Sequence, residues 1–121
     1  MTEIQNSKHY DLEERTLKYA SRIRIFVKRL SRTIANTEDS IQLVRASGSV
    51  GANYIEANES FSKKDFILRV KMCRKEAKES RYWLQLVSIH ENLELARERE
   101  ELIKESTELM NIFGSIIHKS Q

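Results

Sequence analysis

The chain has 121 residues, no proline and only 3 glycines, which fits one domain and excludes β-rich and loop-rich architectures, because those folds need such residues in their turns. Charged residues form 32% of the chain and the formal net charge is +3, while the longest apolar runs have about three residues, far fewer than a membrane-spanning helix requires. One cysteine cannot form an internal disulfide and the N-terminus resembles no targeting signal, so we expect a cytoplasmic protein.

The first predicted helix covers about residues 11–34. Its apolar residues run from Leu12 to Leu30 with a 4,3 spacing, and Thr16 fills the gap in the pattern. This spacing places them on one helical face. Asp11 is a suitable N-cap, because a carboxylate there accepts from the first free backbone N–H groups.

The second predicted helix covers about residues 38–60 and begins just after Thr37. The face that we expect to turn inward consists of Ile41, Val44, Gly48, Gly51 and Ile55. Each glycine costs about 1 kcal/mol relative to alanine inside a helix. We therefore predict that Gly48 and Gly51 form a notch where a neighbouring helix packs closely. A phosphate-binding loop is not indicated, because no strand precedes these glycines.

The third and fourth predicted helices cover about residues 63–89 and 94–118. Ser62 and Asp65 form a capping box at the start of the third helix, and Cys73 lies on its apolar face, where a thiol acts as a small core residue. Four amphipathic helices with short links predict an all-α fold, an antiparallel up-down-up-down four-helix bundle.

The second and fourth helices carry more apolar residues than one bundle core needs. The additional residues are Leu43, Val50, Tyr54, Ile103, Met110 and Ile117. A wide core and a second interface both explain them, and we favour an interface between copies of the chain.

Catalytic and metal-binding patterns are missing from the sequence. The three histidines lie near predicted helix ends, none belongs to a Glu-x-x-His pair, and no serine or cysteine has a plausible histidine partner. We expect no metal, no cofactor and no enzymatic activity.

Basic residues concentrate in two of four segments whose net charge alternates in sign. Residues 1–36 and 62–90 each hold 8 basic residues, against 4 and 3 acidic ones. On the third helix the basic stripe is Lys64, Lys71, Arg74, Lys78 and Arg81, and on the first helix it is Arg15, Lys18, Arg22, Arg29 and Arg32. Such stripes attract nucleic-acid phosphates, but they also form when basic helices pair with acidic neighbours.

Three motifs between Ser47 and Val87 resemble a known family: SxGANYxEAN, SKKDF and KEAKExRYWL. The chain is similar over nearly its whole length to four-helix bundle proteins related to the 23S rRNA intervening-sequence protein. More distantly it resembles the accessory protein of diversity-generating retroelements, a basic homopentamer that binds nucleic acid. Many members of the wider family have Glu-Gly where this chain has Glu56 and Ala57. The resemblance implies a pentamer and no catalytic residues.

Together these observations lead to two hypotheses for function. We expect a homo-oligomeric, non-enzymatic bundle that binds RNA or DNA through its basic surface, without strong sequence preference and without a membrane. The alternative is an oligomeric scaffold or adaptor that binds a protein partner and has no role with nucleic acid.

Overall fold

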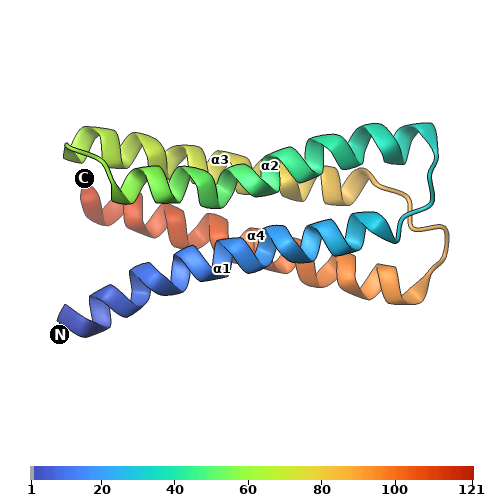
Figure 1. Ribbon diagram of the computed structural model, residues 1–121, viewed down its shortest axis with the longest axis horizontal. Helices are drawn as coiled ribbons and strands as arrows, with labels where there is room; N and C mark the ends of the chain where they lie inside the picture. Colours follow the sequence, from blue (N-terminus) through green and yellow to red (C-terminus); the bar gives the residue numbers. More distant parts are fainter. Residues whose placement is uncertain (1) are drawn as a thin grey trace.

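A computed structural model describes the backbone of residues 2–121 and the side chains of residues 12–121. The chain folds into four α-helices, α1 (Thr2–Lys28), α2 (Ile34–Asn58), α3 (Lys63–Leu86) and α4 (Leu93–Ser120). They run alternately up and down, so both termini lie at one end of the bundle (Figure 1). The predicted four-helix bundle is confirmed. None of the described helices is both long and apolar enough to cross a membrane.

Side-chain caps fix three of the helix starts. Ser62 caps α3 by accepting from Asp65 N, as predicted, and Asn92 caps α4 by accepting from Leu95 N. The expected start of the second helix after Thr37 is wrong, because Thr33 accepts from Asn36 N and α2 begins one turn earlier. The first helix ends at Lys28, about six residues before the predicted end near residue 34.

The start of the first helix differs as well. It begins at Thr2 rather than near Asp11, whose side chain lies outside the described residues.

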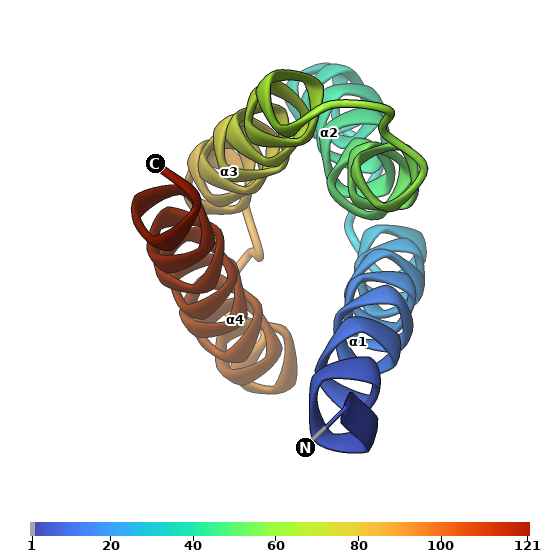
Figure 2. The same ribbon diagram turned by 90° about the vertical axis from the view of Figure 1, so that its left-hand side faces the viewer.

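The core lies between all four helices, which follow one another around it in chain order (Figure 2). Every apolar position predicted on the first helix from Leu12 to Leu30 is buried, and so is Cys73, which was predicted on the apolar face of the third helix. α2 and α3 pack most extensively, whereas α1 and α4 make the fewest contacts of the neighbouring helix pairs. Side chains therefore span the space between α1 and α4.

The inward face of α2 differs from the predicted one. Ile41 and Ile55 are about half exposed, and α2 instead buries Leu43, Val50 and Tyr54 in the core of the single chain. Both sets repeat at heptad-like spacing, and the core takes the bulkier one, which fills the space between α1 and α3.

This arrangement corrects the predicted interface between copies of the chain. Leu43, Val50, Tyr54 and Ile117 are buried within one chain, so they are not available to a second copy. Ile103 and Met110 are partly buried and pack against the same core. The wide apolar arcs on α2 and α4 thus belong largely to the core.

The two glycines of α2 face α1 in different ways. A Cβ atom added to Gly51 would lie 2.8 Å from Thr16 Oγ1 and 3.1 Å from Thr16 Cβ. Thr16 is buried, and its hydroxyl donates to the carbonyl of Leu12. The predicted notch therefore exists at Gly51. At Gly48 the nearest atom would be Arg24 Nη2 at 3.4 Å, the end of a flexible side chain.

Two buried polar contacts join elements that are far apart in sequence. The Tyr19 hydroxyl donates to Ser106 Oγ, because the Ser106 hydroxyl itself donates to Leu102 O. At the opposite end of the bundle from the termini, Asn36 donates to the carbonyls of Ser31 and Ser88 and accepts from Ser88 N at 2.8 Å. This side chain ties the α1–α2 link to the α3–α4 link.

Candidate nucleic-acid interface

The basic residues predicted on the third helix form one surface along α3. We call Lys64, Lys71, Arg74, Lys78 and Arg81 the α3 basic surface. The first four are exposed, and Arg81 is half-buried because its Nη1 donates to Thr107 Oγ1 on α4 at 3.1 Å. The Arg74 guanidinium lies beside Gly114 of α4. The surface therefore extends from α3 toward its seam with α4.

The positive charge of this surface has no acidic partner within the described part of the chain. None of its five members forms an ion pair with a described carboxylate. Lysine and arginine that are not neutralised locally create a positive potential to which a polyanion is attracted.

The basic stripe predicted on the first helix is largely neutralised. Arg15 donates from Nε and Nη2 to both carboxylate oxygens of Glu105, at 2.7 and 2.8 Å. This bidentate contact raises the pKa of Arg15 further above its already high value, chiefly through the hydrogen bond to Glu105. The Arg15 guanidinium is therefore held on α4.

Two further arginines of α1 repeat this pattern. Arg22 pairs with Glu98 at 3.1 Å and Arg29 with Glu94 at 2.7 Å. The basic residues recur every seven positions on α1 and face acidic residues on the antiparallel α4, so the alternating charge of the segments is used here for helix pairing. The prediction that Arg15, Arg22 and Arg29 bind phosphates is therefore not supported by their surroundings. From the same stripe Lys18 and Arg32 are exposed.

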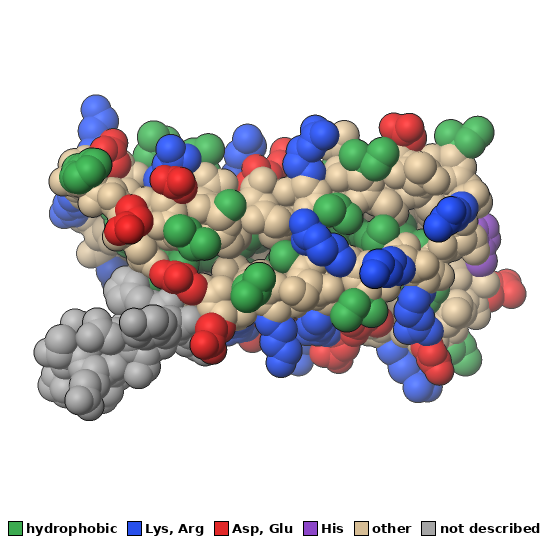
Figure 3. All heavy atoms as spheres, viewed as in Figure 1, with side chains coloured by type: hydrophobic (Ala, Val, Ile, Leu, Met, Phe, Trp, Pro, Cys, Tyr) green, Lys and Arg blue, Asp and Glu red, His purple; other side chains and the backbone are tan. Residues whose placement is uncertain are grey.

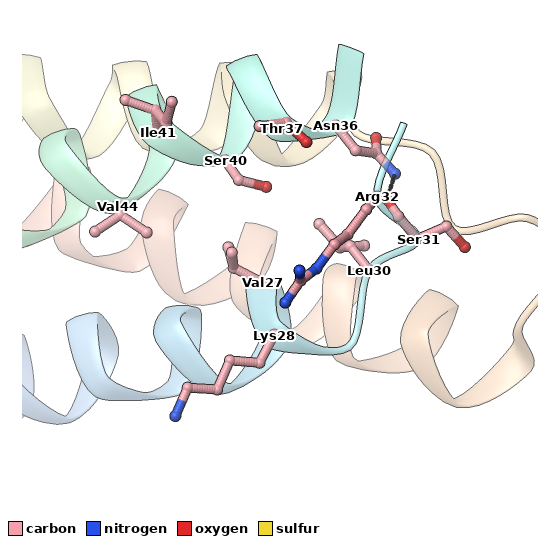
Figure 4. A pocket seen from close by; sticks show the side chains of 10 residues that line it. All are labelled: Val27, Lys28, Leu30, Ser31, Arg32, Asn36, Thr37, Ser40, Ile41 and Val44. Atoms are coloured by element: carbon pink, nitrogen blue, oxygen red, sulfur yellow. Dashed lines mark hydrogen bonds between the residues drawn. The ribbon is translucent and has the colours of Figure 1, made fainter. Parts of the chain in front are cut away.

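A shallow groove of about 850 Å³ lies between the end of α1 and the start of α2. Val27, Leu30, Ile41 and Val44 supply its apolar lining. The Arg32 side chain extends between the two helices (Figure 4). Figure 3 shows this face of the molecule, with exposed hydrophobic side chains and with Lys and Arg gathered from its middle toward the α1–α2 link. The groove thus combines an apolar lining with the cationic side chains of Lys28 and Arg32.

An aromatic side chain, Tyr82, borders the α3 basic surface and was not expected as part of it. It is 54% exposed and directly follows Arg81. Its spacing could have indicated this position, because residues four apart lie on the same side of a helix and Tyr82 follows Lys78 by four.

The described side chains are poorly placed for thiol reactivity and for metal binding. Cys73 is buried, and burial raises its pKa to about 12, which keeps the thiol protonated and unreactive. Among the described side chains, no three histidine, cysteine, aspartate or glutamate residues gather to hold a metal ion.

Comparison with known proteins agrees with the motifs in the sequence. No curated protein matches the chain. A crystal structure of a protein of unknown function from the S23 ribosomal protein family of Bacteroides thetaiotaomicron is 32% identical, with a TM-score of 0.73, and the match covers 87% of this chain and 96% of that one. The family profile described as 23S rRNA-intervening sequence protein matches residues 8–115. The chain therefore belongs to the family of 23S rRNA-intervening sequence proteins.

Proposed function

We propose that this protein binds RNA or DNA through the α3 basic surface, without strong sequence preference, and that it acts as a homo-oligomer and not as an enzyme. One observation carries the proposal. The five cations of this surface have no ion-pair partner among the described carboxylates, whereas three arginines of α1 are paired with glutamates of α4. Contacts to phosphates carry no sequence information by themselves, so little sequence preference is expected.

The test replaces Lys71, Arg74, Lys78 and Arg81 together by Gln. Glutamine is nearly as good a helix former as lysine, so helicity should be kept. A matched control, the α1 variant, replaces Lys18, Arg24 and Lys28 of α1 and Arg32 of the α1–α2 link by Gln, which removes the same charge from another face. Binding of labelled mixed-sequence RNA and DNA is measured by fluorescence anisotropy over a series of salt concentrations.

We expect the wild type to bind at low salt, with an affinity that falls steeply as salt rises, because binding releases condensed counterions. The α3 variant should lose binding and the α1 variant should keep most of it. Equal binding by the wild type and the α3 variant, in which the four α3 cations are replaced by Gln, would exclude the α3 basic surface as the nucleic-acid binding site. Equal losses in the two variants would mean that overall charge, and no defined site, holds the nucleic acid.

The groove between α1 and α2 favours a second candidate function, a scaffold or adaptor that binds a protein partner. Its lining includes Ile41, which is 49% exposed, together with Val27 and Val44. An interface that buries such side chains depends little on salt, in contrast to phosphate contacts. Failure of the wild type to bind nucleic acid at low salt would leave this function as the better one.

A further inference from the structure

Tyr82 presents an aromatic ring at the C-terminal end of the run of basic side chains on α3. It follows Lys78 by four residues and Lys75 by seven, so all three lie on one side of the helix. At 1.5 Å of rise per residue, the two lysines lie about 6 and about 10 Å from Tyr82 along the helix axis. Both lysines lie on the N-terminal side of Tyr82 along the helix, and their long side chains can cover these distances to reach phosphates beside a base held at Tyr82.

The ring of Tyr82 packs against the ring of Trp83. The two ring centroids are 5.0 Å apart and the planes are inclined by 75°, an edge-to-face contact. Trp83 is itself half-buried and packs against the core. The Tyr82 ring is therefore placed by a helix and by a packed neighbour, while more than half of its surface remains open to solvent.

We propose that single-stranded RNA or DNA binds along the α3 basic surface, with a base stacked on Tyr82 while Lys78 and Arg81 of this surface and the adjoining Lys75 contact nearby phosphates. The proposal rests on the proposed nucleic-acid function and narrows it. A duplex buries its base faces in its own stack, so only an unpaired base offers a face to an aromatic side chain. Such stacking tolerates any base, which fits the absence of a base-reading pocket on this exposed helix.

Charge distinguishes this partner from an apolar protein surface. Leu68 and Leu86 are also exposed on α3, but Lys71, Lys75 and Lys78 lie between them along the helix and would have to be desolvated in an apolar interface. The exposed lysines Lys75 and Lys78 outnumber the one exposed carboxylate near Tyr82, Glu79. The face around Tyr82 thus favours a polyanion that also carries flat rings.

The experiment compares Tyr82→Leu, Tyr82→Phe and the matched control Leu86→Ala. Leu86 lies four residues after Tyr82 and is exposed to a similar extent, at 50%. The probes are labelled oligothymidylate and oligouridylate of about 16 nucleotides and a labelled mixed-sequence DNA duplex of equal length. Thermal unfolding confirms that each variant is folded. Trp83, the one tryptophan of the chain, reports local contact through its fluorescence.

We expect Tyr82→Leu to weaken binding of both single strands by about 5- to 100-fold and to leave duplex binding within about twofold, because stacking on an aromatic ring is lost only for unpaired bases. Tyr82→Phe and Leu86→Ala should bind like the wild type. Saturating single strand should change the Trp83 emission of the wild type more than the duplex does.

Two outcomes separate this proposal from the function on which it rests. If the wild type binds the single strands and the duplex, and Tyr82→Leu changes none of these affinities or changes all of them equally, the stacking site is wrong and nucleic-acid binding stands. If the wild type binds neither the single strands nor the duplex at low salt, the proposed function fails and the stacking site fails with it.

Discussion

The two glycines of α2 show how much a single position depends on its neighbour. Gly51 lies against the buried Thr16, so even one added methyl group would approach Thr16 Oγ1 to 2.8 Å. We expect Gly51→Leu to cost about 2–3 kcal/mol of unfolding free energy through overpacking, and Gly51→Ala to destabilise although alanine favours helices. Chemical denaturation measures both.

Gly48→Ala is the control for this prediction. The nearest atom to its new Cβ is the mobile end of Arg24 at 3.4 Å, so the added methyl group is accommodated. Replacing glycine by alanine should then stabilise the chain by up to about 1 kcal/mol. Equal stability of the Gly51→Leu variant and the wild type would show that no notch exists.

Glu76 makes stability depend on pH. Burial raises its pKa to about 7 from 4.5, and the hydrogen bond and charge of Glu79 add to the effect. Between these two pH values the folded state holds a proton that the unfolded state releases. This contribution to stability is complete below pH 4.5 and is lost as the pH rises through 7.

We therefore expect Glu76→Gln to stabilise the protein at a pH about one unit above the folded pKa and to have little effect about one unit below the unfolded pKa. Denaturant unfolding at the two pH values gives the comparison. The same effect of the substitution at both pH values would contradict a raised pKa. Glu79→Gln, which removes the neighbouring charge, should weaken the pH dependence.

At the scale of helices, the sequence predicts a face well only where a helix has one apolar stripe. α1 buries its single stripe from Leu12 to Leu30 as expected. α2 has two stripes of similar spacing, one with Ile41 and Ile55 and one with Leu43 and Val50. Spacing alone cannot choose between them, because the choice depends on which stripe fills the space left by the other helices.

The links between helices contain a contact that no local pattern predicts. Asn36 is buried and makes three hydrogen bonds to backbone groups of Ser31 and Ser88. Asn36→Ala would leave these groups buried without a partner, so we expect a loss of about 3 kcal/mol. Asn111→Ala on the exposed side of α4 is the control and should change stability by less than about 0.5 kcal/mol. A similar small loss for Asn36→Ala would mean that the link is not held by this side chain.

For the molecule as a whole, the candidate site could be predicted from charge only in part. The α3 basic surface was visible in the sequence because its cations recur at heptad-like spacing on one face of the helix. The arginines of α1 have the same spacing, but their role depends on α4, which places Glu94, Glu98 and Glu105 beside them. Which helices become neighbours is a property of the fold, so helix spacing could not separate the two stripes.

The predicted assembly also concerns the whole molecule. Because most of the residues first expected at its interface are buried within one chain, the interface is now expected elsewhere on the surface. With Leu43 and Val50 inside one chain, the large apolar residues of the other stripe that remain exposed on α2 are Ile41 and Ile55. We expect light scattering to give about five times the 14.2 kDa of one chain. Ile41→Glu combined with Ile55→Glu should lower this mass without lowering helicity, because both side chains are exposed in a single chain. Leu43→Ala should instead destabilise the chain by about 2–5 kcal/mol.

Assembly and nucleic-acid binding should then depend on each other. One chain offers five cations on α3, whereas a closed ring repeats them and lets one polyanion contact several copies at high effective concentration. The Ile41 and Ile55 double variant should therefore bind a long single strand at least about 10-fold more weakly than the wild type, although its α3 basic surface is unchanged. A strand short enough to contact one copy should bind both proteins equally. Unchanged mass with unchanged binding would place the interface elsewhere. A wild type that is monomeric at micromolar concentration would leave each α3 basic surface to bind alone.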